Sequence, residues 1–175
     1  MSSASPPLDL AALNAMDRDG FVAAIGPAFE NAPWVAASAW SSRPFASVAA
    51  LHATMLDVVR AAPDDQKLAF LCGHPELDGR EAQTGTMTAE STGEQSSAGL
   101  NALTGAERNE LQSLNRAYRE HHGFPFIIAV RANTKQQIFE AIRTRTAQAT
   151  EIERRAALEQ IGLITRGRID ALVNG

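Results

Sequence analysis

The chain has 175 residues, which is enough for one domain and too few for two substantial ones. Its composition of 45% hydrophobic and 21% charged residues is typical of a globular protein and excludes a disordered tail. The formal net charge is -4 and no basic stripe is present, so nucleic acid is not an expected partner.

The ends of the chain carry no recognisable targeting signal. The N-terminus lacks the basic residues and apolar run of a signal peptide, and the terminal Leu-Val-Asn-Gly is not a peroxisomal signal. The longest apolar run, residues 124–130, is too short to cross a bilayer. The single cysteine, Cys72, has no partner for an internal disulfide, which favours a reducing compartment. We therefore expect a cytoplasmic protein with no membrane partner, and the excess of Arg over Lys favours a bacterial source.

Helical spacing of apolar residues and helix-start signals recur along most of the chain. Residues 1–7 are small and Pro-rich and are expected to be a flexible N-terminus. Helices are predicted to begin at or just after Asp9, Asp17, Pro33, Ser47, Asp64, Thr104, Thr134 and Thr150. The Thr104 helix opens with the capping-box spacing to Glu107, and the last helix runs to Leu172.

Two segments break this pattern. Residues 74–99 are rich in Gly, Ser, Thr, Pro and Glu, and long loops of this kind inside a domain are usually functional or disordered. Residues 123–130 read as a buried strand, but no second strand is available to pair with them, so we expect an extended irregular segment. The prediction is an all-α fold, a single-domain helical bundle of seven to nine helices over residues 8–175.

His74 stands immediately before Pro75, which pushes it out of helical geometry and marks a helix end. A helix end can direct an imidazole into a cleft, where it exchanges protons near neutral pH. The structural alternative is a histidine that interacts favourably with the C-terminal end of the helix dipole.

Glu94 and Gln95 lie in a polar stretch in which Ser91 and Glu94 have capping-box spacing. This spacing predicts that a helix begins at Ser91, which is the structural explanation for the motif. The free N–H groups at such a helix start would also suit an anionic ligand.

Arg168 interrupts an apolar stripe on the last helix, and a buried guanidinium needs a partner. That partner is a structural carboxylate or the carboxylate of a ligand, unless the side chain reaches water. Arg154 falls on nearly the same stripe and is a competing candidate. The four histidines and one cysteine have no metal-ligand spacing, so no metal site is expected.

Four short motifs follow one another between residues 39 and 128, within a resemblance that covers about residues 17–173. They are Ala39-Trp40-Ser41-Ser42-Arg43-Pro44-Phe45, Gly73-His74-Pro75-Glu76-Leu77 with Gly79-Arg80, Ser91-Thr92-Gly93-Glu94-Gln95 with Ala98-Gly99-Leu100, and Leu114-Asn115, Tyr118 and Gly123-Phe124-Pro125-Phe126-Ile127-Ile128. Together they resemble the family of 2-oxo-4-hydroxy-4-carboxy-5-ureidoimidazoline (OHCU) decarboxylases, which catalyse the last step from urate to (S)-allantoin.

The resemblance implies an all-helical fold and a decarboxylation that uses no cofactor and no metal. It implies that His74 is the catalytic acid and that Glu94 acts beside it. It also implies that a ureidoimidazoline substrate is bound by a wider set of residues, Pro75, Ser91, Thr92, Gly93, Glu94, Gln95, Phe126, Ile127, Ile128, Ala129, Val130 and Arg168. A homodimer is implied in the same way.

Two other functions stay open at the level of sequence. One is a lyase that acts on a related ureido or hydantoin acid on the same scaffold. The other is a non-enzymatic helical binding module with an apolar groove. The decarboxylase prediction requires His74, Glu94 and Arg168 to meet at one small cavity.

Overall fold

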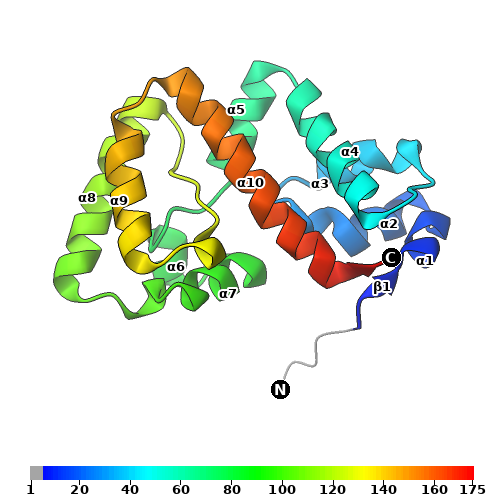
Figure 1. Ribbon diagram of the computed structural model, residues 1–175, viewed down its shortest axis with the longest axis horizontal. Helices are drawn as coiled ribbons and strands as arrows, with labels where there is room; N and C mark the ends of the chain where they lie inside the picture. The colour runs from blue at the N-terminus through cyan, green and yellow to red at the C-terminus, as the bar shows by residue number, and fades with distance from the viewer. Residues whose placement is uncertain (1–5) are drawn as a thin grey trace. The chain divides into compact units, whose positions relative to one another are not determined.

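The computed structural model describes residues 6–175, which fall into two compact units (Figure 1). Unit 1 comprises the chain up to Phe70 together with Gly162–Gly175, and unit 2 comprises Leu71–Ile161. The predicted flexible N-terminus falls outside the described residues at positions 1–5. Pro6 and Pro7 are exposed and have no regular secondary structure.

Unit 1 is built almost entirely from short helices. In chain order its elements are β1 (Leu8–Asp9), α1 (Leu10–Ala15), α2 (Arg18–Ile25), the 3-10 helix η1 (Gly26–Ala28), α3 (Pro33–Ala39), the 3-10 helix η2 (Trp40–Ser42), α4 (Val48–Ala61), most of α5 (Asp64–Cys72), the end of α10 (Thr150–Leu172) and β2 (Val173–Asn174). Helix α3 packs on both α2 and α4, and Phe21, Ile25, Val35, Leu51 and Met55 are fully buried.

Unit 2 contains the two segments that broke the helical pattern of the sequence. Its elements are α6 (Arg80–Thr84), α7 (Ala89–Ser97), the 3-10 helix η3 (Leu100–Ala102), α8 (Gly105–His122), the 3-10 helix η4 (Val130–Ala132), α9 (Lys135–Thr146) and the start of α10. The described residues thus contain ten α-helices, and the predicted all-α class is confirmed. The helix that sequence patterns did not predict is α6, which has five residues and no periodic apolar face.

The described residues also include one pair of two-residue strands. β1 pairs with β2 in parallel, with Leu8 opposite Val173 and Asp9 opposite Asn174. No sheet was expected, because two-residue strands are too short to show the alternation of apolar and polar residues that reveals a strand.

Capping residues begin several helices where the sequence predicts them. Asp17 accepts a hydrogen bond from Gly20 N at 2.8 Å, and Thr104 forms a complete capping box with Glu107. A second capping box opens α9, with Thr134 at its N-cap. Gly123 ends α8 with φ 82°, a left-handed conformation that favours glycine.

The N-cap predicted for α7, Ser91, was wrong by three residues. Thr88 is the N-cap, because its hydroxyl accepts the hydrogen bond from Ser91 N, and the helix begins at Ala89. Ser91 therefore lies inside the first turn, and Glu94 lies in the middle of the helix. The free N–H groups at the start of α7 are consequently not at Glu94.

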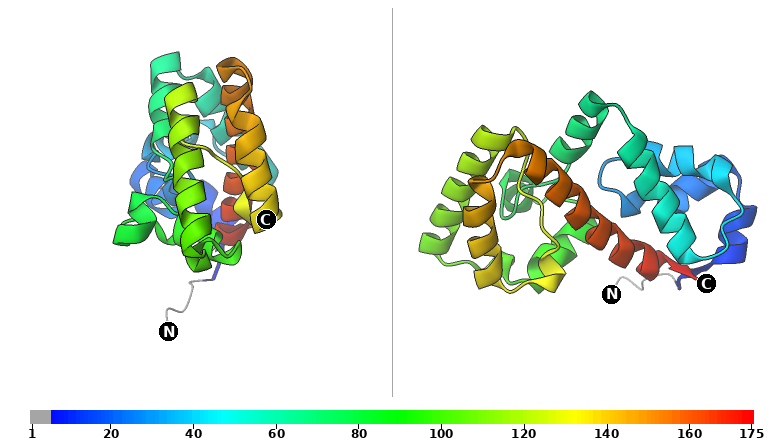
Figure 2. Two further views of the ribbon diagram at one scale, coloured as in Figure 1. Left: turned by 90° about the vertical axis from the view of Figure 1, so that its left-hand side faces the viewer. Right: turned by 45° about the horizontal axis from the view of Figure 1, so that its top comes forward.

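Helices α8 and α9 lie side by side and run in the same direction, with residues 123–130 returning alongside them (Figures 1 and 2). Because α8 and α9 are parallel, the segment that connects the end of α8 to the start of α9 must be about as long as α9. Helix α9 has 12 residues and a length of about 18 Å. Seven extended residues reach about 23 Å, so an extended strand-like segment without a strand partner fits this role. The predicted irregular segment is confirmed.

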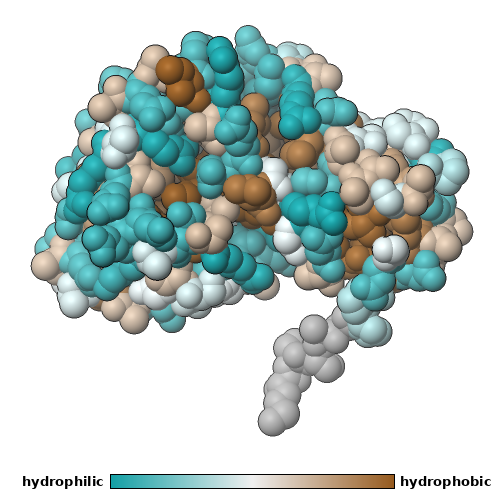
Figure 3. Space-filling model, in the orientation of Figure 1, coloured by the Kyte–Doolittle hydropathy of each residue, from teal (hydrophilic) through white to brown (hydrophobic). Residues whose placement is uncertain are grey.

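A membrane span requires a helix of sufficient length and hydropathy. None of the described helices is both long enough and apolar enough to cross a membrane. On the face seen in Figure 3, hydrophilic side chains cover most of the area and apolar side chains form separate patches.

Candidate active site

His74 lies directly after α5, at the start of unit 2. Its backbone N–H donates to Leu71 O at 3.2 Å, and only 7% of the residue is exposed. The helix end predicted from the His-Pro pair is therefore confirmed. A buried imidazole at this position is held on its N-terminal side by the last turn of α5.

The loop after His74 is tied to α7 through one side chain. Gln95 Oε1 accepts from Asp78 N at 2.9 Å, and Gln95 Nε2 donates to Glu76 O at 3.3 Å. The loop that carries His74 and the helix that carries Glu94 are therefore directly hydrogen-bonded. The amide of Gln95 is engaged with this loop from both of its ends.

Helix α8 holds the same loop from a second direction. Asn115 Nδ2 donates to Leu77 O at 2.9 Å. Arg119 Nε donates to Glu76 Oε1, and Arg108 Nε donates to Asp78 Oδ2, each at 2.7 Å. The loop between Pro75 and Gly79 is thus fixed by three side chains of one helix.

Helix α7 buries one face and exposes the other. Ser91, Glu94 and Gln95 are buried at the i, i+3 and i+4 positions of that face. Thr92 and Gly93 are exposed, and the Thr92 hydroxyl donates to Thr88 O. Thr92 and Gln95 line a cavity of about 430 Å³ in unit 2.

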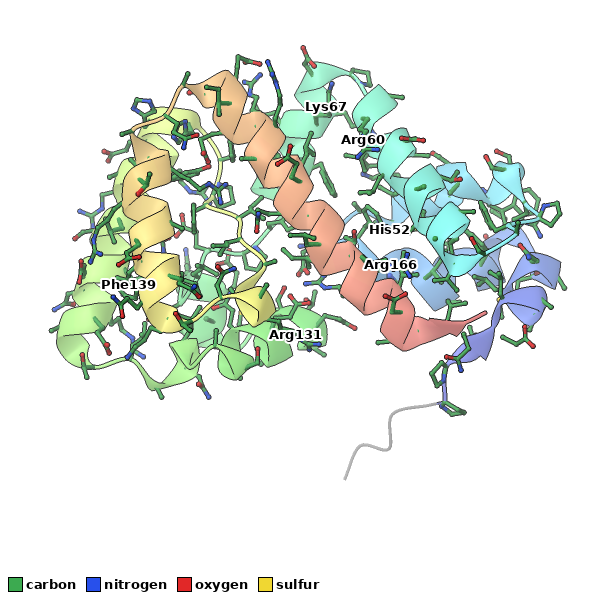
Figure 4. The ribbon with its side chains drawn as sticks, in the orientation of Figure 1. His52, Arg60, Lys67, Arg131, Phe139 and Arg166 are labelled. Carbon is green, nitrogen blue, oxygen red and sulfur yellow. The ribbon has the colours of Figure 1, made fainter. Side chains whose placement is uncertain are left out.

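The extended segment lies against α7 through η4. The two elements are in contact, and Arg131 of η4 is shown beside α7 in Figure 4. The Cβ position at Gly93 would lie 3.9 Å from Arg131 Nη2. The five residues predicted to contact substrate here, Phe126 to Val130, are all buried.

Some main-chain groups of this segment are bonded by other parts of unit 2. Ala129 N donates to Gln160 Oε1 at 2.9 Å, and Ile127 O accepts from Arg145 Nη1 at 3.0 Å. Among the described residues, the main-chain groups of Ile128 take part in no hydrogen bond. A buried peptide of that kind needs a partner, and a polar ligand is one.

A buried ionic network contacts the extended segment through Arg145. Arg145 lies 4.6 Å from the ring centre of Phe126 and pairs with Glu153, which is fully buried. Tyr118 OH donates to Glu153 Oε2 at 2.5 Å. Burial raises the pKa of Tyr118 above its usual value, and the bond to the Glu153 carboxylate raises it further. The Tyr118 hydroxyl is therefore a hydrogen-bond donor at all moderate pH values.

Sequence reasoning missed this network. Glu153 stands in the charged stretch Thr-Glu-Ile-Glu-Arg-Arg, which is typical of an exposed first helical turn. The one available signal was the four-residue spacing from Glu153 to Ala157 and Ile161, both of which are buried.

Arg168 belongs to unit 1, where it is buried. Its Nη1 donates to Glu30 Oε2 at 2.7 Å, and both side chains are almost fully buried. The structural carboxylate left open by the sequence analysis is therefore present. The competing candidate, Arg154 of unit 2, pairs with Glu151 at 3.3 Å and is about one-third exposed.

The predicted site residues of unit 2 lie on three segments, which are the loop at His74, helix α7 and residues 126–130. The loop is hydrogen-bonded to α7, and α7 contacts η4, which begins at Val130. Arg168 is described with unit 1. Among residues 6–175, no group of three or more His, Cys, Asp or Glu side chains is arranged to hold a metal ion.

A sequence profile described as OHCU decarboxylase matches residues 14–170. The chain belongs to the OHCU decarboxylase family. Among its curated relatives, the mouse "2-oxo-4-hydroxy-4-carboxy-5-ureidoimidazoline decarboxylase" is 37% identical over 166 residues, which cover 95% of this chain and 93% of the relative. A protein of the same name from Halalkalicoccus jeotgali is 38% identical over 160 residues, which cover 91% and 89%.

Two solved structures resemble the fold. The crystal structure of (S)-allantoin synthase has a TM-score of 0.76 and 29% identity, and the match covers 96% of this chain and 54% of that chain. This chain thus spans about half the length of that synthase. The crystal structure of an OHCU decarboxylase in the presence of (S)-allantoin has a TM-score of 0.66 at 19% identity, which supports the fold alone.

Proposed function

We propose that this protein decarboxylates OHCU to (S)-allantoin. The observation that carries the proposal is the pair of Gln95 hydrogen bonds, which join the loop of buried His74 to the helix of buried Glu94. Family relatives that carry this activity in their names match nearly the full length of the chain, which supports the same conclusion.

The proposed decarboxylation does not depend on a cofactor to accept electrons. The bond between the ring carbon and the carboxylate breaks, carbon dioxide leaves, and the electron pair passes into the adjacent π system of the ring. One proton is then added to a ring carbon, and the ring hydroxyl transfers its own proton to a ring nitrogen as it becomes the carbonyl of allantoin. Because the ring accepts the electron pair, the protein needs to supply orientation and one directed proton.

His74 is the proposed proton donor. A proton source must stand within hydrogen-bond reach of the reacting atom, and a side chain fixed at a helix end meets that demand. Glu94 is proposed to act on the substrate beside His74. A carboxylate near an imidazole favours the protonated imidazole, which is the form an acid requires.

The remaining proposed contacts bind and orient the substrate. Pro75 and the residues Ser91 to Gln95 are proposed to border it, and the main chain of residues 126–130 is proposed to accept and donate hydrogen bonds. The unbonded main-chain groups of Ile128 support this role. Arg168 is proposed to bind an anionic group of the substrate, because a guanidinium matches a carboxylate with two parallel hydrogen bonds.

Two wider properties remain predictions of the sequence and the resemblance. The single cysteine favours a cytoplasmic location, and the resemblance implies a homodimer. Light scattering during size-exclusion chromatography measures the second property.

The proposal is tested by following the ultraviolet absorbance of OHCU generated in place from urate by uricase and hydroxyisourate hydrolase. We expect the purified protein to accelerate the loss of OHCU in proportion to its concentration. A loss of OHCU that is the same with and without the protein would disprove the proposed function.

A further inference from the structure

Asn115 is a buried polar residue that takes no part in the proposed chemistry. It lies on α8, is 3% exposed, and donates from Nδ2 to Leu77 O at 2.9 Å. Leu77 stands three residues after His74, while Asn115 comes 38 residues further along the chain. The bond therefore joins the candidate catalytic loop to the longest helix that lies wholly within unit 2.

The other half of the Asn115 amide has no partner. Among the described residues, Asn115 Oδ1 is buried and accepts no hydrogen bond. A buried acceptor left unbonded lowers stability, so this asparagine is a poor choice for stability alone. The useful part of the Asn115 amide is its N–H group, which donates to the Leu77 carbonyl.

The loop next to Leu77 is held in an unusual backbone conformation. Asp78 has φ 46°, the left-handed region that non-glycine residues seldom adopt. Such residues persist where their surroundings fix them. Here Gln95 binds Asp78 N, Gln83 Nε2 binds Asp78 O, and Arg108 binds the Asp78 carboxylate.

These bonds control how far the loop can move relative to α7. His74 is fixed on one side by the end of α5, and Leu77 is fixed on the other side by Asn115. Loss of the Leu77 anchor leaves the chain on the C-terminal side of His74 held only through Glu76 and Asp78, so the loop can shift. A misplacement of about 1 Å can lower a catalytic rate about a hundredfold.

We infer that Asn115 is a positioning residue for the proposed decarboxylation, because its amide N–H fixes the Leu77 carbonyl and thereby the orientation of His74. The inference rests on the proposed function. It assigns Asn115 no contact with the substrate.

The test is Asn115→Leu, with Asn109→Leu as the matched control. Leucine has the same number and branching of side-chain heavy atoms as asparagine, and the change exchanges one unbonded acceptor, Asn115 Oδ1, for another, Leu77 O. The free energy of unfolding should therefore change little. Asn109 lies exposed on the same helix and receives the same chemical change.

For Asn115→Leu we expect kcat for OHCU loss to fall about tenfold to a hundredfold, while KM changes less than about threefold. The allantoin formed should also lose (S) excess, because the slow uncatalysed reaction competes. Asn109→Leu should match the wild type in all three readouts. A folded Asn115→Leu protein with wild-type kcat and (S) excess would overturn the inference.

A second pair of variants serves if Asn115→Leu does not fold. Arg108→Met removes the ion pair to Asp78 from a partly exposed position, and Arg116→Met is its control on the same helix. We expect a lower kcat for Arg108→Met alone, and equal kcat values for both variants would overturn the account of the anchored loop. A wild-type protein without activity would instead refute the proposed function, so the two failures are distinguishable.

Discussion

Buried polar side chains in unit 2 concentrate on the loop after α5 and on one face of α7. His74, Ser91, Glu94 and Gln95 were all selected from the sequence, and all are buried. The resemblance of the motifs selected them, since the residues alone left a structural explanation open for each. Glu30 and Glu153 were not predictable, because their partners Arg168 and Arg145 are recognised only in the folded chain.

Replacement of His74 by alanine removes the proposed proton donor. General acid–base catalysis is typically worth about 10²–10⁴-fold, so we expect the rate of OHCU loss to fall at least about a hundredfold. The far-ultraviolet circular dichroism should be unchanged. His121→Ala, at an exposed histidine of α8, should retain wild-type activity. Near-normal turnover by His74→Ala would exclude the assigned role.

Arg168→Lys keeps a positive charge beside Glu30 but removes the planar guanidinium fork. Loss of a charged hydrogen bond of about 1.5–3 kcal/mol predicts a KM for OHCU that is about tenfold higher or more. Steady-state kinetics measure this effect, and Arg154→Lys is the control at the competing arginine. A raised KM for Arg154→Lys with an unchanged KM for Arg168→Lys would reverse the assignment.

At the scale of elements, capping chemistry was the most informative part of the sequence. Thr104 and Thr134 each stand three residues before a glutamate or a glutamine, and this capping-box spacing marks a helix start in the sequence. Helix α7 was misplaced because Ser91 and Glu94 have the same spacing, while the true cap is Thr88. Two overlapping cap motifs cannot be ranked without the tertiary contacts that α7 makes.

The Glu107 capping box predicts a dependence of stability on pH. Hydrogen bonds from Lys135 and from the Thr104 backbone lower the pKa of Glu107 to about 2, from a usual value of 4.5. A lowered folded-state pKa stabilises the protein above the unfolded pKa, and this stabilisation is lost as the pH falls from about 4.5 toward 2. Glu107→Gln retains a capping side chain but does not titrate.

We therefore expect wild type to be more stable than Glu107→Gln at pH 6, with a difference that narrows below pH 4.5 as measured by urea unfolding. Glu120→Gln, at an exposed position of the same helix with no ion pair among the described residues, should show no such trend. A difference between wild type and Glu107→Gln that stays constant with pH would contradict the role of the Glu107 charge.

The buried network links α8, α9 and α10 through one carboxylate. Tyr118→Phe removes the hydrogen bond to Glu153 but leaves Glu153 paired with Arg145. Hydrogen bonds to charged groups contribute about 1.5–3 kcal/mol, so the free energy of unfolding should fall by about that amount. Urea unfolding with an unchanged m-value measures the loss, and an unchanged free energy would show that the bond contributes nothing.

At the scale of the whole molecule, the all-α class was predicted from helix caps and from a sequence pattern that indicated no pair of strands. The extended segment at residues 124–130 was also predictable, since an apolar run without a strand partner must be buried in another way. The parallel course of α8 and α9, which gives that segment its role, was not predictable, because helix direction depends on packing between elements distant in sequence. The site residues of unit 2 were selected by their motifs, whereas Arg168 of unit 1 was selected by its position in an apolar helical stripe.

The measurement that tests the proposed reaction most directly is the circular dichroism of allantoin formed from urate with uricase, hydroxyisourate hydrolase and this protein. The uncatalysed reaction gives racemic allantoin with no net signal, so any signal reports a proton delivered to one face. We predict a growing (S)-allantoin signal with the wild type and a strongly reduced one with His74→Ala. A racemic product in the presence of active upstream enzymes and folded wild-type protein would contradict the account.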